Sequence, residues 1–333
     1  MLFSNFKGYL EARDETLLNS KYITYPSVNC LIYKSKIITR LGIENDGTPS
    51  TNEKKIHSAF VWIDSANGMR PLRATAQKLQ LKYDGKWIDI FDSLDSEVER
   101  VHFATWVDGN DSIVHKRLFF CDGSTNLYQW NGAVSKVGSW DGSTNTLTLD
   151  IPDTCEKQGY DPGNSTAQDV YILSLDSDGN VDNIEEATYN NDPSSEDTLS
   201  LTASPSHTPE AGDIVVAKPT TFADAISADF DIDMVYSFKN HLVVASYNKT
   251  ELYFSNIDDY SLSSGLDFTM PASGDRTAAT AIYFNLDGKI TSLIAKENKL
   301  WVSDPNDWYK ITKLTNNANA HGMWVNTEKL ETS

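Results

Sequence analysis

The sequence has few cysteines, no long apolar run and fewer basic than acidic residues. Its three cysteines, Cys30, Cys121 and Cys155, are widely spaced and include no CxxC pair, so we expect neither a disulfide framework nor a zinc site, and folding in a reducing environment. No stretch approaches the roughly eighteen apolar residues that a membrane helix requires. The opening MLFSNFKGYLEARDE carries charge and lacks an apolar centre, so we expect no classical secretory signal and no membrane insertion.

Basic residues are outnumbered, with 28 Lys and Arg against 47 Asp and Glu, which gives a formal net charge of −19. A surface that grips nucleic-acid phosphates needs clustered Lys and Arg, so we expect no specific binding to nucleic acid. The acidic excess is typical of a solvated β surface. A second interpretation is an acidic channel wall, along which DNA passes transiently without sticking.

Signatures of common enzyme and metal sites are absent. No GxSxG, Walker loop or dinucleotide fingerprint occurs. SDPNDW (Ser303 to Trp308) approaches the Asp-box of sialidases but lacks its spacing and its glycine. DSDGNVDNIEE (Asp176 to Glu186) offers oxygen ligands for calcium, yet its glycine is fourth instead of sixth, so the Asp178-Gly179 step predicts a hairpin turn instead. We therefore predict no enzyme activity, no catalytic residue, no metal site and no cofactor.

What the sequence does contain is repetition. LYFSNIDDY (Leu252 to Tyr260) aligns with LWVSDPNDW (Leu300 to Trp308) at an offset of 48, which places Ser255 on Ser303. Each copy lies among short apolar runs separated by polar turns. The pattern predicts a repeated unit of several short strands.

An earlier pair of segments repeats in the same way. LQLKYDGKWIDI (Leu79 to Ile90) lies over NLYQWNGAVSKV (Asn126 to Val137) at a shift of 47, with Tyr83 on Trp130. The dipeptides Asp84-Gly85 and Asn131-Gly132 each predict a tight hairpin, because both turn positions need a positive φ.

Self-similarity at a period of roughly 40 to 50 residues, with about four strands per period, is typical of β-propeller blades. We predict an all-β fold, a β-propeller-like array of four-stranded blades with an inserted small β domain. The insertion is expected because residues 139–220 turn rich in Ser, Thr, Asn, Asp and Gly, with islands of alternating apolar and polar residues. The four predicted segments are 1–52, an N-terminal arm with strands around Lys34-Ser35-Lys36 that could close a ring; 53–138, blades 1 and 2; 139–220, the insertion; and 221–333, blades 3 and 4 with a C-terminal tail.

Side chains that could be mistaken for a site have simpler structural roles in this pattern. His57 and His102 fall at similar first-strand positions, which suggests a repeated packing role. The recurring tryptophans are expected to pack between blades more than to stack on a ligand; they are Trp62, Trp87, Trp106, Trp130, Trp301 and Trp308. Four polar residues are predicted to cap their own turns: Asp258, Asp259, Asn306 and Asp307.

The units resemble a group of tailed-bacteriophage virion proteins built as β-propellers, found at the neck or as the tail nozzle. The resemblance lies in KIITRLGI (Lys36 to Ile43), in both hairpin-like segments and in LYFSNIDDY and LWVSDPNDW, and covers about half of the chain. WD40 and kelch signatures are absent. The resemblance implies a structural protein that oligomerises as a ring, is assembled in the host cytoplasm into the virion, and uses its inserted domain against other tail, connector or portal proteins.

We therefore predict a structural virion protein of a phage tail or neck, forming part of the DNA channel wall and docking to neighbouring subunits. A glycan- or receptor-binding propeller is the first alternative and would show exposed tryptophans in a pocket. A glycoside hydrolase of propeller fold is the second and would show two carboxylates facing one cleft.

Overall fold

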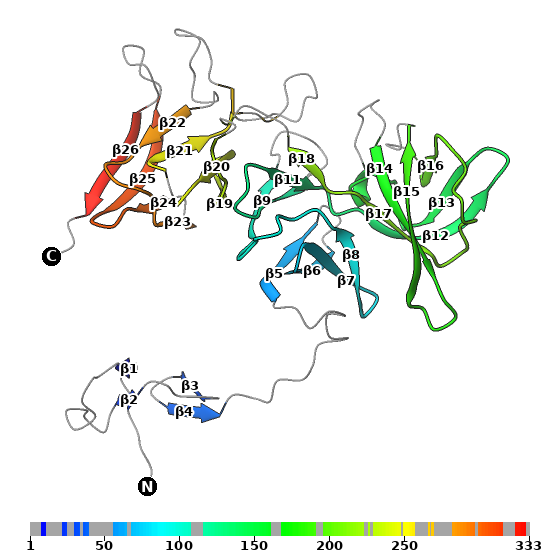
Figure 1. The fold of residues 1–333 in the computed structure, drawn as a ribbon, viewed down its shortest axis with the longest axis horizontal. Coiled ribbons are helices and arrows are strands. Elements are labelled where there is room, and N and C mark those ends of the chain that lie inside the picture. Colours follow the sequence, from blue (N-terminus) through cyan, green and yellow to red (C-terminus); the bar gives the residue numbers. More distant parts are fainter. Residues whose placement is uncertain are drawn as a thin grey trace. The chain divides into compact units, whose positions relative to one another are not determined.

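Figure 1 shows the computed structural model of the chain, which divides into two compact units, Met1–Pro49 and Ser50–Ser333. The structure describes residues 8–10, 22–24, 30–33, 36–39, 56–64, 68–107, 116–160, 168–190, 196–222, 226, 229–247, 249–256, 266, 268–269, 282–296, 299–315 and 324–330. Within these ranges, no helix is long and apolar enough to cross a membrane.

The first unit contains two small sheets. Strand β1 (Gly8–Leu10) pairs in parallel with β2 (Tyr22–Thr24), and β3 (Cys30–Tyr33) pairs antiparallel with β4 (Lys36–Thr39). The second pair confirms the two short strands predicted around Lys34-Ser35-Lys36. Each of these strands pairs within its own two-stranded sheet, and the closure of a ring by this arm stays a prediction.

Blade 1 is a meander of four antiparallel strands in chain order, β5 (Ile56–Ile63), β6 (Met69–Thr75), β7 (Lys78–Tyr83) and β8 (Lys86–Phe91). Alternate residues of each strand point to the same face. The predicted hairpin at Asp84-Gly85 is confirmed, since these residues join β7 to β8 with φ angles of 49° and 79°.

Blade 2 takes its fourth strand from far along the chain. Its strands in spatial order are β9 (His102–Val107), β10 (Lys116–Cys121), β11 (Leu127–Trp130) and β18 (Thr220–Phe222). The hairpin predicted at Asn131-Gly132 is therefore wrong. Gly132 has the positive φ of such a turn, 86°, but the chain leaves the blade there. The strand that pairs with the edge of β11 is β18, and not β12, which follows β11 in the chain.

The departing chain forms a six-stranded antiparallel sheet, drawn in green in Figure 1. Its strands in spatial order are β15 (Val181–Tyr189), β14 (Gln168–Leu175), β17 (Ile214–Ala217), β12 (Val134–Asp141), β13 (Thr146–Asp150) and β16 (Thr198–Ser200). The sheet begins at Val134, a few residues earlier than the predicted start at 139. The hairpin predicted at Asp178-Gly179 joins β14 to β15 and is confirmed.

Blades 3 and 4 are again four-stranded meanders. Blade 3 consists of β19 (Met234–Phe238), β20 (His241–Ala245), β21 (Glu251–Phe254) and β22 (Ile282–Asn285), and blade 4 of β23 (Ser292–Lys296), β24 (Lys299–Ser303), β25 (Trp308–Thr315) and β26 (Trp324–Leu330). The all-β class and the four-stranded blades are confirmed.

The offset of 48 does not relate equivalent strands. It places Leu252, in the third strand of blade 3, on Leu300, in the second strand of blade 4. In both segments the serine binds the preceding part of its own hairpin. Ser255 Oγ accepts from Leu242 N of β20 at 2.8 Å, and Ser303 O accepts from Thr291 N, just before β23, at 2.8 Å. The repeat is thus one of hairpins rather than of whole blades.

The blades pack in series through shared cores. One core joins blade 1, blade 2 and the six-stranded sheet, a second joins blades 2 and 3, and a third joins blades 3 and 4. The first strands also contact one another in sequence, β5 with β9, β9 with β19, and β19 with β23. Apolar side chains on both faces of the middle blades account for this stacking, since neither face of such a blade can remain in water without loss of hydrophobic stabilisation.

Candidate functional site

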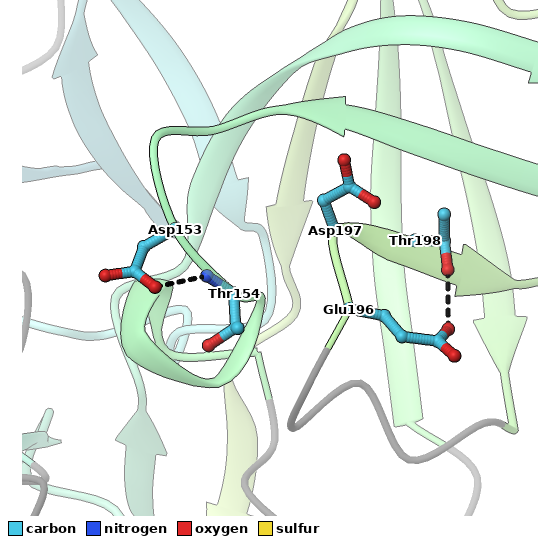
Figure 2. A pocket seen from close by; sticks show the side chains of 5 residues that line it. All are labelled: Asp153, Thr154, Glu196, Asp197 and Thr198. Carbon is cyan, nitrogen blue, oxygen red and sulfur yellow. Dashed lines mark hydrogen bonds between the residues drawn. The ribbon is translucent and has the colours of Figure 1, made fainter.

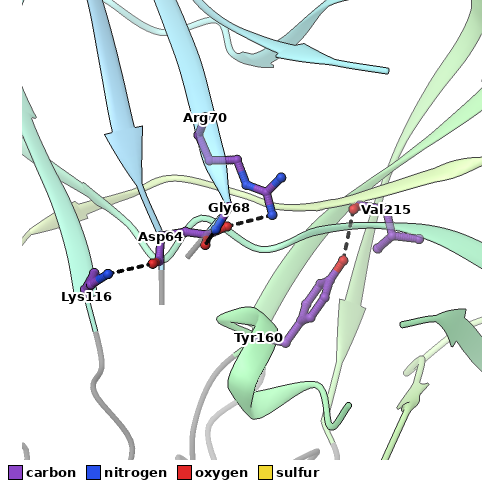
Figure 3. Close-up of polar contacts among 6 residues, drawn as sticks. All are labelled: Asp64, Gly68, Arg70, Lys116, Tyr160 and Val215. Carbon is purple, nitrogen blue, oxygen red and sulfur yellow. Dashed lines mark hydrogen bonds and ion pairs between the residues drawn. The ribbon is translucent and has the colours of Figure 1, made fainter. Parts of the chain in front are cut away.

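A buried polar cluster joins blades 1 and 2 beside Gly132, where the chain leaves for the six-stranded sheet; Figure 3 draws this cluster and a Tyr160–Val215 contact within that sheet. Asp64 follows β5 and is fully buried. Its carboxylate accepts a hydrogen bond from Gly68 N at 2.7 Å and lies 2.6 Å from Arg70 Nη2. Lys116 of blade 2 donates from Nζ to Asp64 O at 3.0 Å. A buried carboxylate without such partners would be costly, so these contacts hold the end of β5 and the start of β6 against blade 2.

Two aromatic side chains donate hydrogen bonds to backbone carbonyls of β17, a strand of the insertion. Trp130 Nε1 donates to Ala217 O at 2.7 Å and Tyr160 Oη donates to Val215 O at 2.9 Å. A Cβ on Gly132 would stand 2.2 Å from Trp62, and one on Gly159 would stand 2.5 Å from the carbonyl oxygen of Asn131. Both glycines are therefore required by close approach as well as by their positive φ.

The insertion also contacts the β7–β8 hairpin of blade 1. Lys136 of β12 forms an ion pair with Asp84 at 2.8 Å, and this contact lowers the pKa of the Asp84 carboxyl and raises the pKa of Lys136. Lys86 Nζ donates to Asp178 O at 2.8 Å. Both contacts are solvent-exposed and add little stability, but they orient the six-stranded sheet on the blade.

Polar contacts join the first strand of blade 2 to the first strand of blade 3 and to the turn that follows it. His102 Nε2 lies 3.1 Å from Tyr236 Oη, and Trp106 Nε1 donates to Asn240 O at 3.0 Å. Burial, with a smaller contribution from the nearby positive charge of Arg100, lowers the pKa of His102 to about 4. His102 is thus a neutral packing residue at neutral pH. His57, on the first strand of blade 1, is half-buried in the same way, as the repeat predicted.

Turns at the ends of strands are held by aspartates. Asp304 accepts hydrogen bonds at 2.8 Å from the backbone N–H groups of Asn306 and Asp307. Asp122, which follows the second strand of blade 2 as Asp304 follows that of blade 4, accepts from Ser124 N at 3.1 Å. The capping residue in blade 4 is therefore Asp304, and the predicted Asn306 and Asp307 are capped.

The equivalence of Asp122 and Asp304 was visible in the sequence, as an aspartate directly after an apolar strand and two residues before Ser or Asn. Neither aspartate was predicted as a cap. Asp258 and Asp259, predicted in the same role, lie outside the described residues.

A pocket of about 600 Å³ opens beside β13 and β16 of the insertion (Figure 2). It is lined by Asp153, Thr154, Glu196, Asp197 and Thr198. Asp153 forms an ion pair with Lys157 at 2.8 Å, and this contact lowers the pKa of the Asp153 carboxyl. Glu196 accepts from Thr198 Oγ1 at 2.8 Å. The Asp153 and Glu196 carboxylates thus bind neighbouring side chains of the insertion. Among the described residues that line the pocket, none is aromatic.

In the hairpin that was considered for calcium, the Asp176 carboxylate binds backbone N–H groups of the same hairpin. The Asp176 carboxylate accepts from Asp178 N at 2.9 Å and from Asn180 N at 2.7 Å, and these contacts lower the pKa of that carboxyl. Over the part of the chain that the structure describes, no group of three or more His, Cys, Asp or Glu is arranged to hold a metal.

Three of the six recurring tryptophans belong to the cores between blades, as predicted. Trp62, Trp106 and Trp130 are fully buried, and the rings of Trp62 and Trp130 lie 5.6 Å apart. Trp87 instead lies under Arg73, with the guanidinium 4.2 Å from the ring centroid. Trp308 departs most from the prediction, because it is partly exposed on blade 4.

No protein-family model and no curated protein matches the sequence. Among solved structures the chain has a distant similarity to β-propeller proteins. Hsv2 of Kluyveromyces lactis has 10% identity and a TM-score of 0.21, with 80% of this chain and 77% of that chain covered. Saccharomyces cerevisiae Sqt1 has 13% identity and a TM-score of 0.19, with coverage of 79% and 72%. BBS1N, in its complex with ARL6DN, has 9% identity and a TM-score of 0.19, with coverage of 76% and 78%.

Proposed function

We propose that the protein is a structural virion component of a bacteriophage tail or neck, without enzymatic activity. In this role the blades form part of the wall of the DNA channel, and the six-stranded sheet docks to neighbouring tail, connector or portal subunits. Assembly takes place in the host cytoplasm. The proposal extends the sequence resemblance, and the following features of the molecule support it.

The observation that carries the proposal is the serial stacking of the blades along their first strands. Consecutive blades share cores, and β5, β9, β19 and β23 contact one another in that order. Such an array buries its strand edges between neighbours and is stiff, as a channel wall must be.

The first strands also carry the right kind of surface for transient passage of DNA. The sequences of β5, β9 and β19 contain neither Lys nor Arg. Their exposed side chains include Val61, Ile63 and Val107. These three strands offer no cation to phosphate oxygens, whereas the first strand of blade 4, β23, ends in Lys296. DNA can therefore move along the first strands of blades 1 to 3 without being held.

The six-stranded sheet has the properties of a docking domain. It has its own core, and it enters and leaves blade 2 at one point, where Ala217 N donates to Ala133 O at 3.0 Å. Its edge strand β15 leaves Asp182, Ile184 and Glu186 exposed. An exposed edge of mixed apolar and acidic character suits a protein partner better than DNA.

The proposed function is tested on virus particles. Antibodies raised against the purified protein should label the tail or neck of purified virions in electron micrographs, and mass spectrometry of the same particles should detect the chain. An antibody against the major capsid protein serves as the control for particle integrity. Detection of the chain in infected-cell lysates but not in purified particles would overturn the proposal.

A further inference from the structure

The two edge strands of the six-stranded sheet, β15 and β16, meet at one point. Tyr189 of β15 forms an antiparallel bridge with Leu201, the residue directly after β16. Next to this bridge, Thr202 N donates to Thr188 O at 2.8 Å. Among the described residues, the rest of β15 is paired with β14 alone. The sheet is therefore closed at one end of β15 only.

The chain after the bridge does not continue this pairing. The same register would place Ser206 opposite Ile184 and point its N–H at Ile184 O, because every second residue of a strand turns its N–H and C=O to the same side. Ser206 N donates instead to the carboxylate of Glu185, at 2.6 Å. Ser206 Oγ, at 3.0 Å, and His207 N, at 3.1 Å, donate to the same carboxylate. One side chain thus replaces the backbone of β15 as the acceptor for this segment.

The segment 202–208, which we call the strap, runs along the edge of β15 between two buried residues, Leu201 and Pro209. All of its residues except Pro205 are exposed. Beyond the hydrogen bond of its first residue to β15, it is held there by the three hydrogen bonds to the Glu185 carboxylate. Contacts this few and this exposed are the kind that open locally at low cost.

The backbone edge under the strap is not used by it. Ile184 and Glu186 turn their N–H and C=O groups to the same side as Thr188, whose carbonyl accepts from the strap. Neither residue forms a backbone hydrogen bond with the described residues of the strap. Edge groups of this kind are a template for an added strand. The strap shields the template without pairing with it.

The strand under the strap is acidic. β15 contains Asp182, Glu185 and Glu186 and neither Lys nor Arg. Glu186 forms an ion pair with Lys218 at 2.8 Å, and Ile184, between the acidic residues, is 45% exposed. A segment that takes the place of the strap removes the donors of Glu185, so it must supply cations of its own, together with an apolar residue beside Ile184.

We propose that the strap is a displaceable cover, and that an extended segment of a partner protein adds to the edge of β15 in its place. The segment carries an apolar residue for contact with Ile184 and Lys or Arg at neighbouring positions, for Asp182 and Glu185. Backbone hydrogen bonds to Ile184 and Glu186 provide affinity, and the charges provide selectivity. The inference rests on the proposed function only for the source of this segment, a neighbouring tail, connector or portal subunit.

The probe is the synthetic peptide TKTVRKT with both ends blocked, which places valine between two lysines on one face of a strand. Its affinity for the purified full chain is measured by fluorescence anisotropy, and its position by hydrogen exchange in NMR spectra. Bound peptide should slow the exchange of the Ile184 and Glu186 amide protons by about tenfold or more.

A methylated peptide tests whether the contact is strand addition. Methyl groups on the valine and lysine amide nitrogens keep every charge but remove the N–H groups that face β15. This peptide should not bind, whereas a peptide methylated at the intervening threonine and arginine should bind. Equal binding of both methylated peptides would overturn strand addition.

Ser206→Pro tests the strap. This change removes the N–H that Glu185 accepts and leaves β15 unaltered, so the strap is released and the peptide should bind about fivefold more tightly. Ser204→Pro is the matched control, because Ser204 is also exposed and its N–H forms no hydrogen bond within the described residues. It should bind the peptide like the natural chain. Absence of binding by both the natural chain and Ser206→Pro would overturn the inference, and equal affinity of all three proteins would overturn the role of the strap.

Ile184→Lys and Ile56→Lys distinguish the site from a general attraction of a basic peptide to an acidic protein. The two residues are 45% and 50% exposed, and both variants change the net charge equally. Ile184→Lys should weaken binding by about tenfold or more, because it places a cation among those of the peptide. Ile56→Lys, on β5 of blade 1, should have little effect. Equal weakening by both would overturn the site on β15.

These outcomes are separate from those of the proposed function. A chain that binds the peptide at β15 but is absent from virions keeps the site and loses the phage assignment. A chain present in virions that binds no peptide at β15 keeps the assignment and loses the site.

Discussion

At the scale of single residues, the junction between blade 1, blade 2 and the insertion depends on positions where no side chain fits. Gly132 combines a positive φ of 86° with a predicted Cβ position 2.2 Å from the ring of Trp62. Gly85 has a similar φ of 79° and no atom within 4 Å of its Cβ position. Alanine substitutions at the two glycines therefore distinguish the free-energy cost of backbone strain from that of overpacking.

Gly132→Ala should lower the free energy of unfolding by about 3 kcal/mol, because the Trp62 ring must move as well as the backbone. Gly85→Ala should lower it by only about 1 kcal/mol, the cost of the positive φ. Urea unfolding followed by circular dichroism measures both. Equal losses for the two variants would show that the Trp62 ring yields without cost.

The lowered pKa of His102 makes the free energy of unfolding depend on pH. Its pKa is lowered to about 4 in the folded chain, chiefly by burial, and is about 6.5 in an unfolded chain. Unfolding therefore takes up a proton between these values, so stability from this group is fully present above about pH 6.5 and is lost as the pH falls towards 4. The loss is on the order of 3 kcal/mol.

The His102 prediction is measured as unfolding free energy against pH for the natural chain and for His102→Asn. The difference between the two profiles should be flat above about pH 6.5 and change steadily below it. A difference that stays constant from neutral pH to pH 4 would contradict the assigned role of His102.

At the scale of elements, the insertion is a separate sheet threaded through blade 2. It occupies the point where the third strand of the blade would otherwise turn into the fourth. Its ends are adjacent, since Ala217 N donates to Ala133 O, and it has its own core around Leu147, Tyr160 and Val215. An element with neighbouring ends and its own core is expected to fold independently.

A fragment of residues 132–219 should therefore fold alone and unfold cooperatively, with dispersed amide signals in NMR spectra. Leu173 and Ile214, which face the blade core in the full chain, would be uncovered in the fragment. A second fragment with Leu173→Ser and Ile214→Ser counters aggregation from this surface. If neither fragment shows a cooperative transition, the insertion depends on the blades for its fold.

At the scale of the whole molecule, the acidic net charge disfavours binding to nucleic acid. The net charge of −19 repels phosphates, and the first strands of blades 1, 2 and 3 contain no Lys or Arg. Fluorescence anisotropy of a labelled duplex should therefore show no binding at low salt, where electrostatic attraction is strongest. Binding that weakens steeply with added salt would reveal a basic surface and contradict the passive channel wall.

Much of the fold could be predicted from local pattern alone. The hairpins at Asp84-Gly85 and Asp178-Gly179 follow from the conformations that these dipeptides favour, and the burial of Trp62 and Trp130 follows from apolar alternation. The hairpin at Asn131-Gly132 failed for a different reason. The dipeptide has the expected φ at Gly132, but β18, nearly ninety residues later, pairs with β11 in place of the next strand.

The sequence by itself determined the all-β class, the four-stranded units and the acidic character of the chain, because these depend on alternation, turn residues and composition. Only the tertiary structure decided which strand completes blade 2 and which cores join consecutive blades. These features depend on which distant segments meet, and a local pattern is compatible with many such pairings.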